Sequence, residues 1–479
     1  MSLSTAFDTA KSSLAASQQQ TAIIARNIAN VNTVGATRKY ANVVTGMNGQ
    51  VQVKSVTQSS NYALFRNMLD ASAAVGKGNV ISNGLDRLSE TLGDTELSRS
   101  PASMISKLSD AMNTLSASPN NYELARNAAT AAADLVQTIN DASITAQTIR
   151  KDADNELVNA AAQMNKLLAS IEILNKEVIA GTRTGADVTD ISDQRDQAVA
   201  ALSQYVGVSI VMRGENDMVL YTDSGVTLFE TTARAVEFTA TPGLNETVTE
   251  GNALRIDGTA VTGSTAYMPL KSGSVAGLVA LRDDVLVTYQ TQLDEMARGL
   301  VEAFTEKQAG SPTIMGLFKA DTATLNPDGT IATGLVGLAG SLRLADGVTT
   351  TPTMLRDGIT YDYNTTDLGG FTGRLNELGT AMAATRTFSS LAGADPSGSI
   401  ADFAASSVSW LQATRQTSLT ETEYKTTLLE RTQDTLSNET GINMDEQLTQ
   451  MLQFERSFQA SSKLISTIDE MLQTLLNSI

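Results

Sequence analysis

The chain has 479 residues, which is room for two to four domains at about 100–200 residues each. Its 52 acidic and 34 basic residues give a formal charge of −18, which argues against nucleic acid as the main partner because phosphate binding needs a basic surface. The absence of His and Cys excludes Ser-His-Asp triads, cysteine nucleophiles, disulfides and almost all zinc, copper and haem sites, so we expect no cofactor.

The apolar runs of the sequence are all far shorter than the roughly 20 residues that span a membrane. The first residues also lack the apolar segment of a secretory signal. We therefore expect no membrane insertion, and any export to use a route without a cleaved signal.

The first 31 residues repeat apolar and small side chains at alternating spacings of four and three, which is the pattern of a coiled-coil seam. The large apolar members of this predicted assembly seam are Leu3, Phe7, Leu14, Ile24, Ile28 and Val31.

The helices between the two ends are predicted from their 3.6-residue periodicity over 84–118, 120–180, 187–206, 274–307, 375–391 and 400–436. Pro119 is expected in the first turn of the second helix, and residues 181–185 are expected to interrupt the helical structure before the third helix. The period falls to two between residues 207 and 239, and again over 253–269, which predicts short antiparallel strands. Residues 309–373 are expected to form loops with a few strands or short helices.

The C-terminal end has a second heptad, with one three-residue slip that we interpret as local overwinding of a coiled coil. Its large seam residues are Met444, Leu448, Met451, Phe458, Ile465, Ile468, Leu472 and Leu475. Residues 1–40 have a net charge of +3 and residues 440–479 a net charge of −3, so we predict that the two ends pair, with two separate solvated helices as the alternative.

The predicted fold class is α+β, predominantly α: an elongated multidomain rod with paired N- and C-terminal coiled-coil helices, a helical middle domain and a small antiparallel β domain. The predicted domains are a terminal coiled coil (1–45 with 440–479), a discontinuous helical domain (46–206, 273–308 and 374–439), a β domain (207–272) and a loop-rich insertion (309–373).

Residues 27–38 form an Asn-rich stretch with Asn27, Asn30, Asn32 and Gly35, the composition of a helix that ends in a turn. It resembles a motif shared by the flagellar axial proteins of rod, hook and hook–filament junction, although Val34 and Ala36 stand where a proline and an aromatic residue are usual.

Three further blocks resemble the same family. Residues 440–475, where Gly441 supplies a bend before the helix, resemble its C-terminal helix. Residues 190–208 and 272–283 resemble the helix-to-strand junction and the return helix of its hook-associated members. The first of these two blocks contains Asp193, Gln194, Arg195 and Asp196.

Some acidic and glycine-rich patterns have two interpretations. Asp190, Asp193 and Asp196 are spaced by three on a predicted helix, which fits either a carboxylate site or a charged face with local ion pairs. The absence of His favours the charged face, packed against the β domain, and the same holds for 283–284 after Arg282. The glycines at 334, 337 and 340 lack the strand–helix–acid context of a nucleotide site.

The resemblance implies a non-enzymatic structural adaptor that joins hook to filament in an extracellular bacterial flagellum. It also implies self-association in a ring, contacts with the hook protein and the second hook–filament junction protein, secretion through the flagellar type III export apparatus, and an export chaperone at the C-terminal arm. Hook protein or the second junction protein remains an alternative, as does a secreted surface adhesin. Because the seam has few large apolar residues, we expect both arms to be marginal until neighbouring copies cover them.

Overall fold

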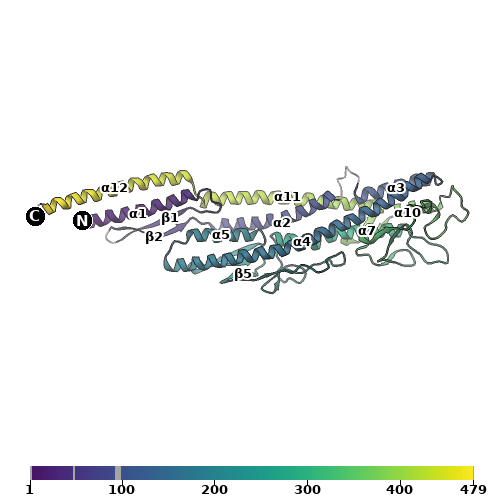
Figure 1. Ribbon diagram of the computed structural model, residues 1–479, viewed down its shortest axis with the longest axis horizontal. Coiled ribbons are helices and arrows are strands. Elements are labelled where there is room, and N and C mark those ends of the chain that lie inside the picture. The colour runs from purple at the N-terminus through teal and green to yellow at the C-terminus, as the bar shows by residue number, and fades with distance from the viewer. Residues whose placement is uncertain (1–2, 47–48, 92–98, 478–479) are drawn as a thin grey trace.

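The structure is a computed structural model that describes residues 3–46, 49–91 and 99–477. The molecule is elongated, with long helices along its main axis and both ends of the chain at one tip (Figure 1). Small antiparallel sheets accompany the helices. The predicted α+β class, its helical predominance and the rod-like shape are therefore confirmed.

The terminal arm consists of α1 (Leu3–Ala29), α12 (Met444–Asn477) and a hairpin of β1 (Lys39–Thr45) and β2 (Val51–Gln58). Helix α1 contacts α12 and, on another side, both strands of the hairpin (Figure 1). The strands pair antiparallel from Lys39↔Gln58 to Thr45↔Val51, with a bulge between Asn42 and Val43. The hairpin was not among the predicted elements, although the alternation of apolar and polar residues from Val51 onward is its sequence signal.

The body contains α2 (Tyr62–Thr91), α3 (Pro101–Ala117), α4 (Tyr122–Thr184) and α5 (Thr189–Ser203). The single helix predicted over 84–118 is wrong, because Pro101 starts a new helix at its first position behind the cap Ser100.

The limits of α4 also differ from the prediction. Pro119 precedes the helix rather than lying in its first turn, since Asn121 caps α4 by accepting hydrogen bonds from two backbone N–H groups. At the other end, α4 continues through Gly181 and stops at Gly185, which adopts a left-handed conformation with φ of 72°.

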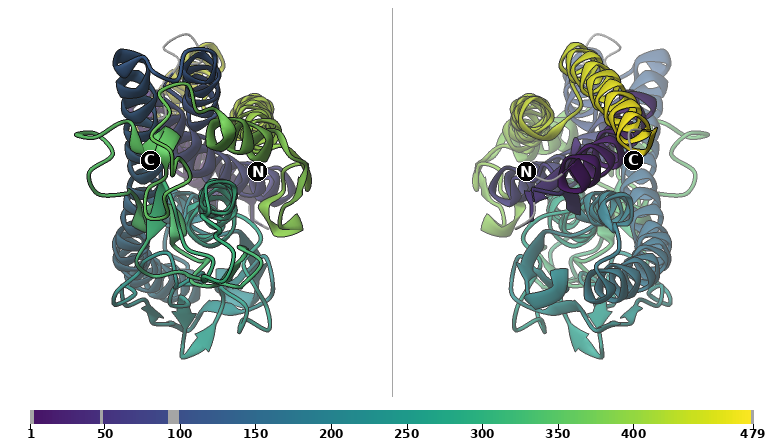
Figure 2. Two further views of the ribbon diagram at one scale, coloured as in Figure 1. Left: turned by 90° about the vertical axis from the view of Figure 1, so that its right-hand side faces the viewer. Right: turned by 90° about the vertical axis from the view of Figure 1, so that its left-hand side faces the viewer.

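The predicted strands of the β region are present. In chain order β3 (Val208–Met212), β4 (Met218–Thr222), β5 (Thr227–Glu230) and β6 (Thr232–Ala233) form one antiparallel sheet, with the short helix η2 (Gly214–Asn216) between the first two. A second sheet consists of β7 (Val236–Glu237), β8 (Arg255–Ile256) and β9 (Thr259–Ala260). Both sheets contact α4, and the strands gather along one side of the helices when viewed end-on (Figure 2).

The chain returns through α6 (Ser274–Ala280), the π-helix η3 (Leu281–Val285) and α7 (Leu286–Ala303), four residues short of the predicted end at 307. The insertion that follows contains β10 (Phe318–Ala320), β11 (Thr324–Leu325), β12 (Ile331–Thr333), α8 (Leu338–Ser341), β13 (Leu342–Leu344) and α9 (Met354–Asp357).

The last part of the body contains α10 (Gly373–Ala383), β14 (Arg386–Thr387), η4 (Ser390–Ala392), β15 (Ser397–Gly398) and α11 (Ile400–Thr440). The helix predicted over 375–391 ends early because β14 pairs with β15. Helix α11 packs along α2. Buried apolar side chains from residues 68–411 form one cluster, which contains no residue of the terminal arm.

Candidate assembly interface

The two ends of the chain pair as antiparallel helices. Ser13 Oγ lies 3.2 Å from Ser461 Oγ, Ser17 Oγ donates to Ser457 Oγ at 3.4 Å, and Asn27 Nδ2 donates to Gln447 Oε1 at 2.8 Å. The two residue numbers of each pair add to 474. The register between α1 and α12 is therefore constant over most of their shared length.

Most of the predicted seam residues are at least half-buried in the arm. Ile24 and Ile468 are buried, and the half-buried members are Leu3, Phe7, Leu14, Ile28, Val31, Met444, Met451, Phe458 and Ile465. Leu448, Leu472 and Leu475 are exposed by 46, 37 and 53%. The register places Leu3, the first described residue of α1, opposite residue 471. Leu472 and Leu475 therefore lie beyond the part of α1 that the structure describes.

The covered face of α12 needs no slip. It follows an unbroken repeat of four and three, made of Gln447, Met451, Phe454, Phe458, Ser461, Ile465 and Ile468. The slip interpreted as overwinding is therefore wrong. Sequence reasoning chose Leu448 over Gln447 because it preferred an apolar residue, whereas the structure buries Gln447, whose Oε1 accepts a hydrogen bond from Asn27 while its Nε2 has no partner among the described residues.

Asn27 of the Asn-rich motif joins three segments of the arm. Its side chain is 1% exposed, and its amide donates to the Lys39 carbonyl oxygen at 2.8 Å and accepts from the Lys39 N–H at 3.0 Å. The second amide hydrogen goes to Gln447. Only an amide offers donors and an acceptor in this arrangement, so one side chain fixes α1, β1 and α12 together.

The turn that follows α1 docks on α5. Asn30 Oδ1 accepts a hydrogen bond from Thr33 Oγ1 at 3.4 Å, whereas Asn32 is exposed. Gly35 has φ of 76°, and a Cβ there would come within 2.8 Å of the Gln197 side chain. A glycine is therefore required by both the left-handed backbone and the close approach.

The aspartates of α5 hold the basic residues of the N-terminal segment. Asp193 accepts from the Thr37 N–H at 2.9 Å and from Thr37 Oγ1 at 2.7 Å, and it forms a buried ion pair with Lys39. Asp190 lies 3.4 Å from the Arg26 guanidinium. The prediction of local ion pairs on a face packed against the β domain is therefore wrong for Asp190 and Asp193, whose ion pairs are long-range contacts with the arm.

Asp187, just before α5, also binds Arg26, at 2.8 Å. Burial opposes the charged form of Asp187, but hydrogen bonds from Thr189 and from Arg26 outweigh it and lower the pKa of the carboxyl. Arg26, in the last turn of α1, is therefore held by two carboxylates.

Arg195 and Asp196 face the body rather than the arm. Arg195 is buried and donates to Asn175 Oδ1 of α4 at 2.8 Å and to the Asn216 carbonyl oxygen at 2.7 Å, so it fastens the β3–β4 turn to the helices as predicted. Burial raises the pKa of Asp196 to about 6, although 19% of its side chain is exposed. Gln194 is exposed.

The chain bends at Gly441, between α11 and α12. A Cβ there would come within 2.4 Å of the Ser437 carbonyl oxygen. The Arg38 N–H donates to the Thr440 carbonyl oxygen at 2.8 Å, and the Arg38 guanidinium pairs with Glu446 at 2.8 Å. The arm is thus tied to α11 by the same segment, residues 37–39, that ties it to α5.

A second buried polar cluster lies inside the body. The Arg282 guanidinium is fully buried and contacts Asp154 at 2.5 Å and Asp283 at 2.7 Å. Arg150, also buried, donates to the carbonyl oxygens of Asn245 and Val248 at 3.0 and 2.6 Å. Sequence reasoning did not single out Arg150 or Asp154, because a charge on a long helix gives no sign that a loop will cover it.

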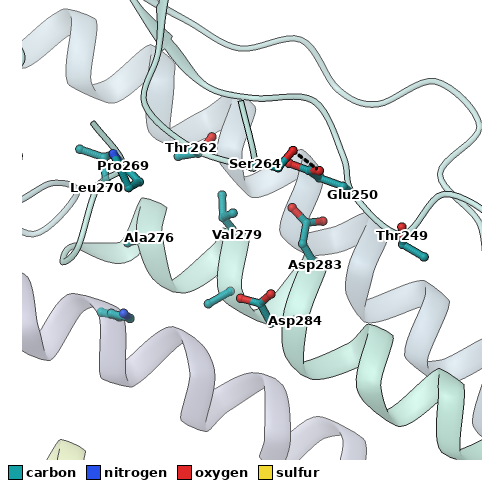
Figure 3. A pocket seen from close by; sticks show the side chains of 13 residues that line it. Thr249, Glu250, Thr262, Ser264, Pro269, Leu270, Ala276, Val279, Asp283 and Asp284 are labelled. Carbon is teal, nitrogen blue, oxygen red and sulfur yellow. Dashed lines mark hydrogen bonds between the residues drawn. The ribbon is translucent and has the colours of Figure 1, made fainter. Parts of the chain in front are cut away.

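The acidic pair at 283–284 borders a cavity of about 540 Å³ between α6, η3 and residues 249–270 (Figure 3). Asp283 also accepts from the Gly251 N–H at 3.1 Å, and Glu250 accepts from Ser264 Oγ at 2.7 Å. Among residues 3–46, 49–91 and 99–477, no group of three or more carboxylates is placed to hold a metal ion. Asp283 and Glu250 act as hydrogen-bond acceptors for the loop residues around them.

Of the glycine run, Gly334 and Gly337 precede α8 and Gly340 lies within it. Asp294 of α7 accepts hydrogen bonds at 2.9 Å from the N–H groups of Gly337 and Ala339. Burial raises the pKa of Asp294 to about 6. Asp294 therefore caps the short helix α8 and holds it against α7.

Within the described part of the chain, no helix combines the length and the apolar character that crossing a membrane requires.

Three family models match the sequence. A flagellar basal body rod protein model matches residues 7–37, the FlgEFG rod protein C-terminal model matches residues 436–478, and the model of the helical domain of flagellar hook-associated protein FlgK matches residues 85–316. The two rod models coincide with the paired helices of the arm. The chain is thus similar to flagellar hook-associated proteins over its helical body and to rod proteins at both ends.

Curated proteins with the name flagellar hook-associated protein 1 match much of the sequence. The flagellar hook-associated protein 1 of Bacillus subtilis (strain 168) is 22% identical over 98% of this chain and 97% of its own length. That of Escherichia coli (strain K12) is 28% identical over 64% of this chain and 58% of its own length. The flagellar hook junction protein FlgK of Burkholderia pseudomallei has 20% sequence identity and a TM-score of 0.44 over 54% of this chain and 47% of its own.

Two contacts of the family motif were not predicted from the sequence. Lys39 follows the Asn-rich stretch and completes it, since its backbone binds Asn27 and its side chain binds Asp193. Gln447 on α12 receives the remaining Asn27 hydrogen. A signal for Lys39 was available in the sequence, because it is one of the four bases in residues 1–40 that made the N-terminal end positive.

Proposed function

We propose that this protein is a structural adaptor, without enzymatic activity, that joins the hook to the filament of a bacterial flagellum. The observation that carries the proposal is the terminal arm. Its two helices coincide with the parts matched by rod-protein models, and together they leave much apolar surface uncovered.

Large apolar side chains are exposed over the whole length of the arm. They are Val34, Tyr40, Val43, Val44, Leu448, Leu452, Leu464, Met471, Leu472, Leu475 and Leu476. Many exposed apolar side chains on one part of a protein are typical of contacts with other proteins. We propose that copies of the chain associate in a ring through their arms, and that the predicted seam residues together with this surface form the assembly interface.

The remaining partners follow from a place in the flagellum. Hook protein would lie on one side of the ring and the second hook–filament junction protein on the other. The chain would reach this extracellular position through the flagellar type III export apparatus, with an export chaperone on the apolar surface of α12. Such capture suits an arm that is ordered only when its outer surface is covered, and hydrogen exchange on the free monomer tests this: strong protection in α1 and α12 would contradict it.

We further propose that the arm and the body are separate mechanical units. The predicted helical domain, β domain and insertion share one cluster of buried apolar residues, so they would move as one body. The arm would pivot on Gly441 and on the contacts of residues 37–39. This arrangement would let the body absorb the mismatch between a bending hook and a stiff filament.

Deletion of the gene, followed by electron microscopy, tests the proposed role. We expect hooks without filaments, with flagellin released into the medium, and recovery of filaments when the gene is restored. Filaments of normal number on the deletion strain would refute the adaptor role. Loss of hooks would instead indicate the hook protein, and loss of surface attachment with intact filaments would indicate an adhesin.

A further inference from the structure

Two exposed surfaces of the terminal arm lie on different elements that both pack on α1 (Figure 1). The hairpin face consists of Tyr40 and Asn42, which pair with Thr57 and Ser55 of β2. Alternate residues of a strand share one face, so these two side chains do as well. Both are exposed, Tyr40 by 48%.

The helix stripe consists of Leu448, Leu452 and Glu455 on α12. Their spacings of four and three place them on one flank of the helix. Leu448 and Leu452 are exposed by 46 and 57%. Leu448 belonged to the predicted seam, but the structure puts it on this flank, outside the contact with α1.

The two surfaces are complementary in charge. The segment 39–58 contains Lys39 and Lys54 and no acidic residue, whereas residues 444–477 contain five acids and two bases. Within the described residues, Glu446 is the only acid of α12 that forms an ion pair, so Glu455 is available to a basic partner. Lys54 is exposed and is not part of an ion pair in the described chain.

The hairpin face and the helix stripe also lie at the same height along the arm. The Val51 N–H donates to Ser12 Oγ at 3.0 Å, which fixes the level of β2 on α1. Thr57, opposite Tyr40, is six residues farther, or about 20 Å at ~3.3 Å per residue. About 13 helical residues at ~1.5 Å cover the same distance. Tyr40 is thus level with about residue 25 of α1.

Because α1 and α12 pair in a constant register, residue 25 of α1 lies opposite about residue 449 of α12. Tyr40 is therefore at the height of Leu448. The same conversion puts Asn42 level with about residue 453, next to Leu452, and Lys54 level with about residue 455. Copies related by rotation about an axis parallel to the arm keep these levels, and a contact between two different surfaces closes such a ring.

We propose that the hairpin face of one copy packs on the helix stripe of the next copy, with Tyr40 against Leu448 and Asn42 against Leu452. Lys54 and Glu455 would add electrostatic attraction at the same level. This inference rests on the ring association proposed above and names its contact surfaces.

Cysteine cross-linking tests the contact without interference, because the chain has no cysteine of its own. The gene is replaced in its own bacterium by one encoding Y40C with L448C, and flagella are sheared, oxidised and separated on a non-reducing gel. The matched control combines Y40C with S462C, since Ser462 is exposed on the same flank but two heptads away, about 21 Å along the helix. Each single-cysteine variant is a second control.

We expect a ladder of covalent multimers for the 40–448 pair and none for the 40–462 pair or the single variants. Flagella that carry filaments but show no ladder, or show it only for the 40–462 pair, would overturn the inference and leave the adaptor role intact. Normal filaments in the gene-deletion strain would overturn the adaptor role itself. If cysteines at 40 and 448 prevent filament formation, N42C with L452C tests the same surfaces one step along and is judged by the same outcomes.

Discussion

Replacing Arg282 should open the contact between the β region and the helices. Its guanidinium is fully buried and holds Asp154 of α4, Asp283 and the Asn252 carbonyl oxygen. Arg282→Met has similar volume but leaves the Asp154 carboxylate buried without its cation. Loss of one partner from a buried ion pair costs about 3–5 kcal/mol.

Helix α4, which carries Asp154, also offers a matched control. Arg87 pairs with Asp152, only two residues from Asp154, and the side chains of this pair are 52 and 50% exposed. Solvent screens such a pair, so Arg87→Met should cost about 0–1 kcal/mol. The two variants therefore compare the same chemical change in a buried and an exposed setting.

Native-state hydrogen exchange measures the effect where it arises, which matters because a chain with several structural units has no single unfolding free energy. Every 1.4 kcal/mol changes an equilibrium tenfold. We therefore expect amides of α4 near Asp154 and of residues 241–252 to exchange about 100 to 3,000 times faster in Arg282→Met. Adding Asp154→Asn should recover part of the loss by removing the stranded charge. Equal exchange in the Arg282 and Arg87 variants would refute the reasoning.

Three further perturbations test α5 and the terminal arm. Because burial raises the pKa of Asp196 from 3.8 to about 6, the folded state holds this proton more tightly, and stability should fall as the pH rises from about 4 to 6; Asp294 contributes a slope of the same sign, so Asp196→Asn should reduce the slope and raise the melting temperature at pH 7.5, and an unchanged slope would contradict the assignment. Asn27→Ala leaves three buried polar groups of β1 and α12 without partners, at about 1–2 kcal/mol each, so limited proteolysis should cut residues 39–58 faster than in the exposed control Asn32→Ala. Leu472→Asp changes a residue that is 37% exposed, so the monomer should keep its circular dichroism and melting temperature while filaments fail to attach. The control Leu391→Asp, at an 80% exposed position outside the arm, should leave the filaments attached. Attached filaments in both strains would show that Leu472 is not part of the interface.

The family motif shows why a short polar pattern predicts helix ends and turns more reliably than it predicts the residues that these turns contact. Asn27, Gly35 and Gly441 were singled out for local reasons, namely helix ends and turns, and the structure places them at such ends. Asn27 binds Lys39 and Gln447, the latter 420 residues away, and Gly35 lies against Gln197. A hydrogen bond between such distant residues leaves no local spacing in the sequence.

The paired ends, the helical predominance and the short antiparallel strands were determined by the sequence, because heptads and period-two alternation reflect which face of each element is buried. Only the tertiary structure decided which residues of α12 meet α1, since Leu448 and Gln447 are neighbours and the choice depends on Asn27 across the interface. It also decided that the aspartates of α5 hold the arm and that Arg150 and Arg282 are buried under the β region. A charged side chain looks solvated in sequence until another segment folds over it and supplies the acceptors that compensate its burial.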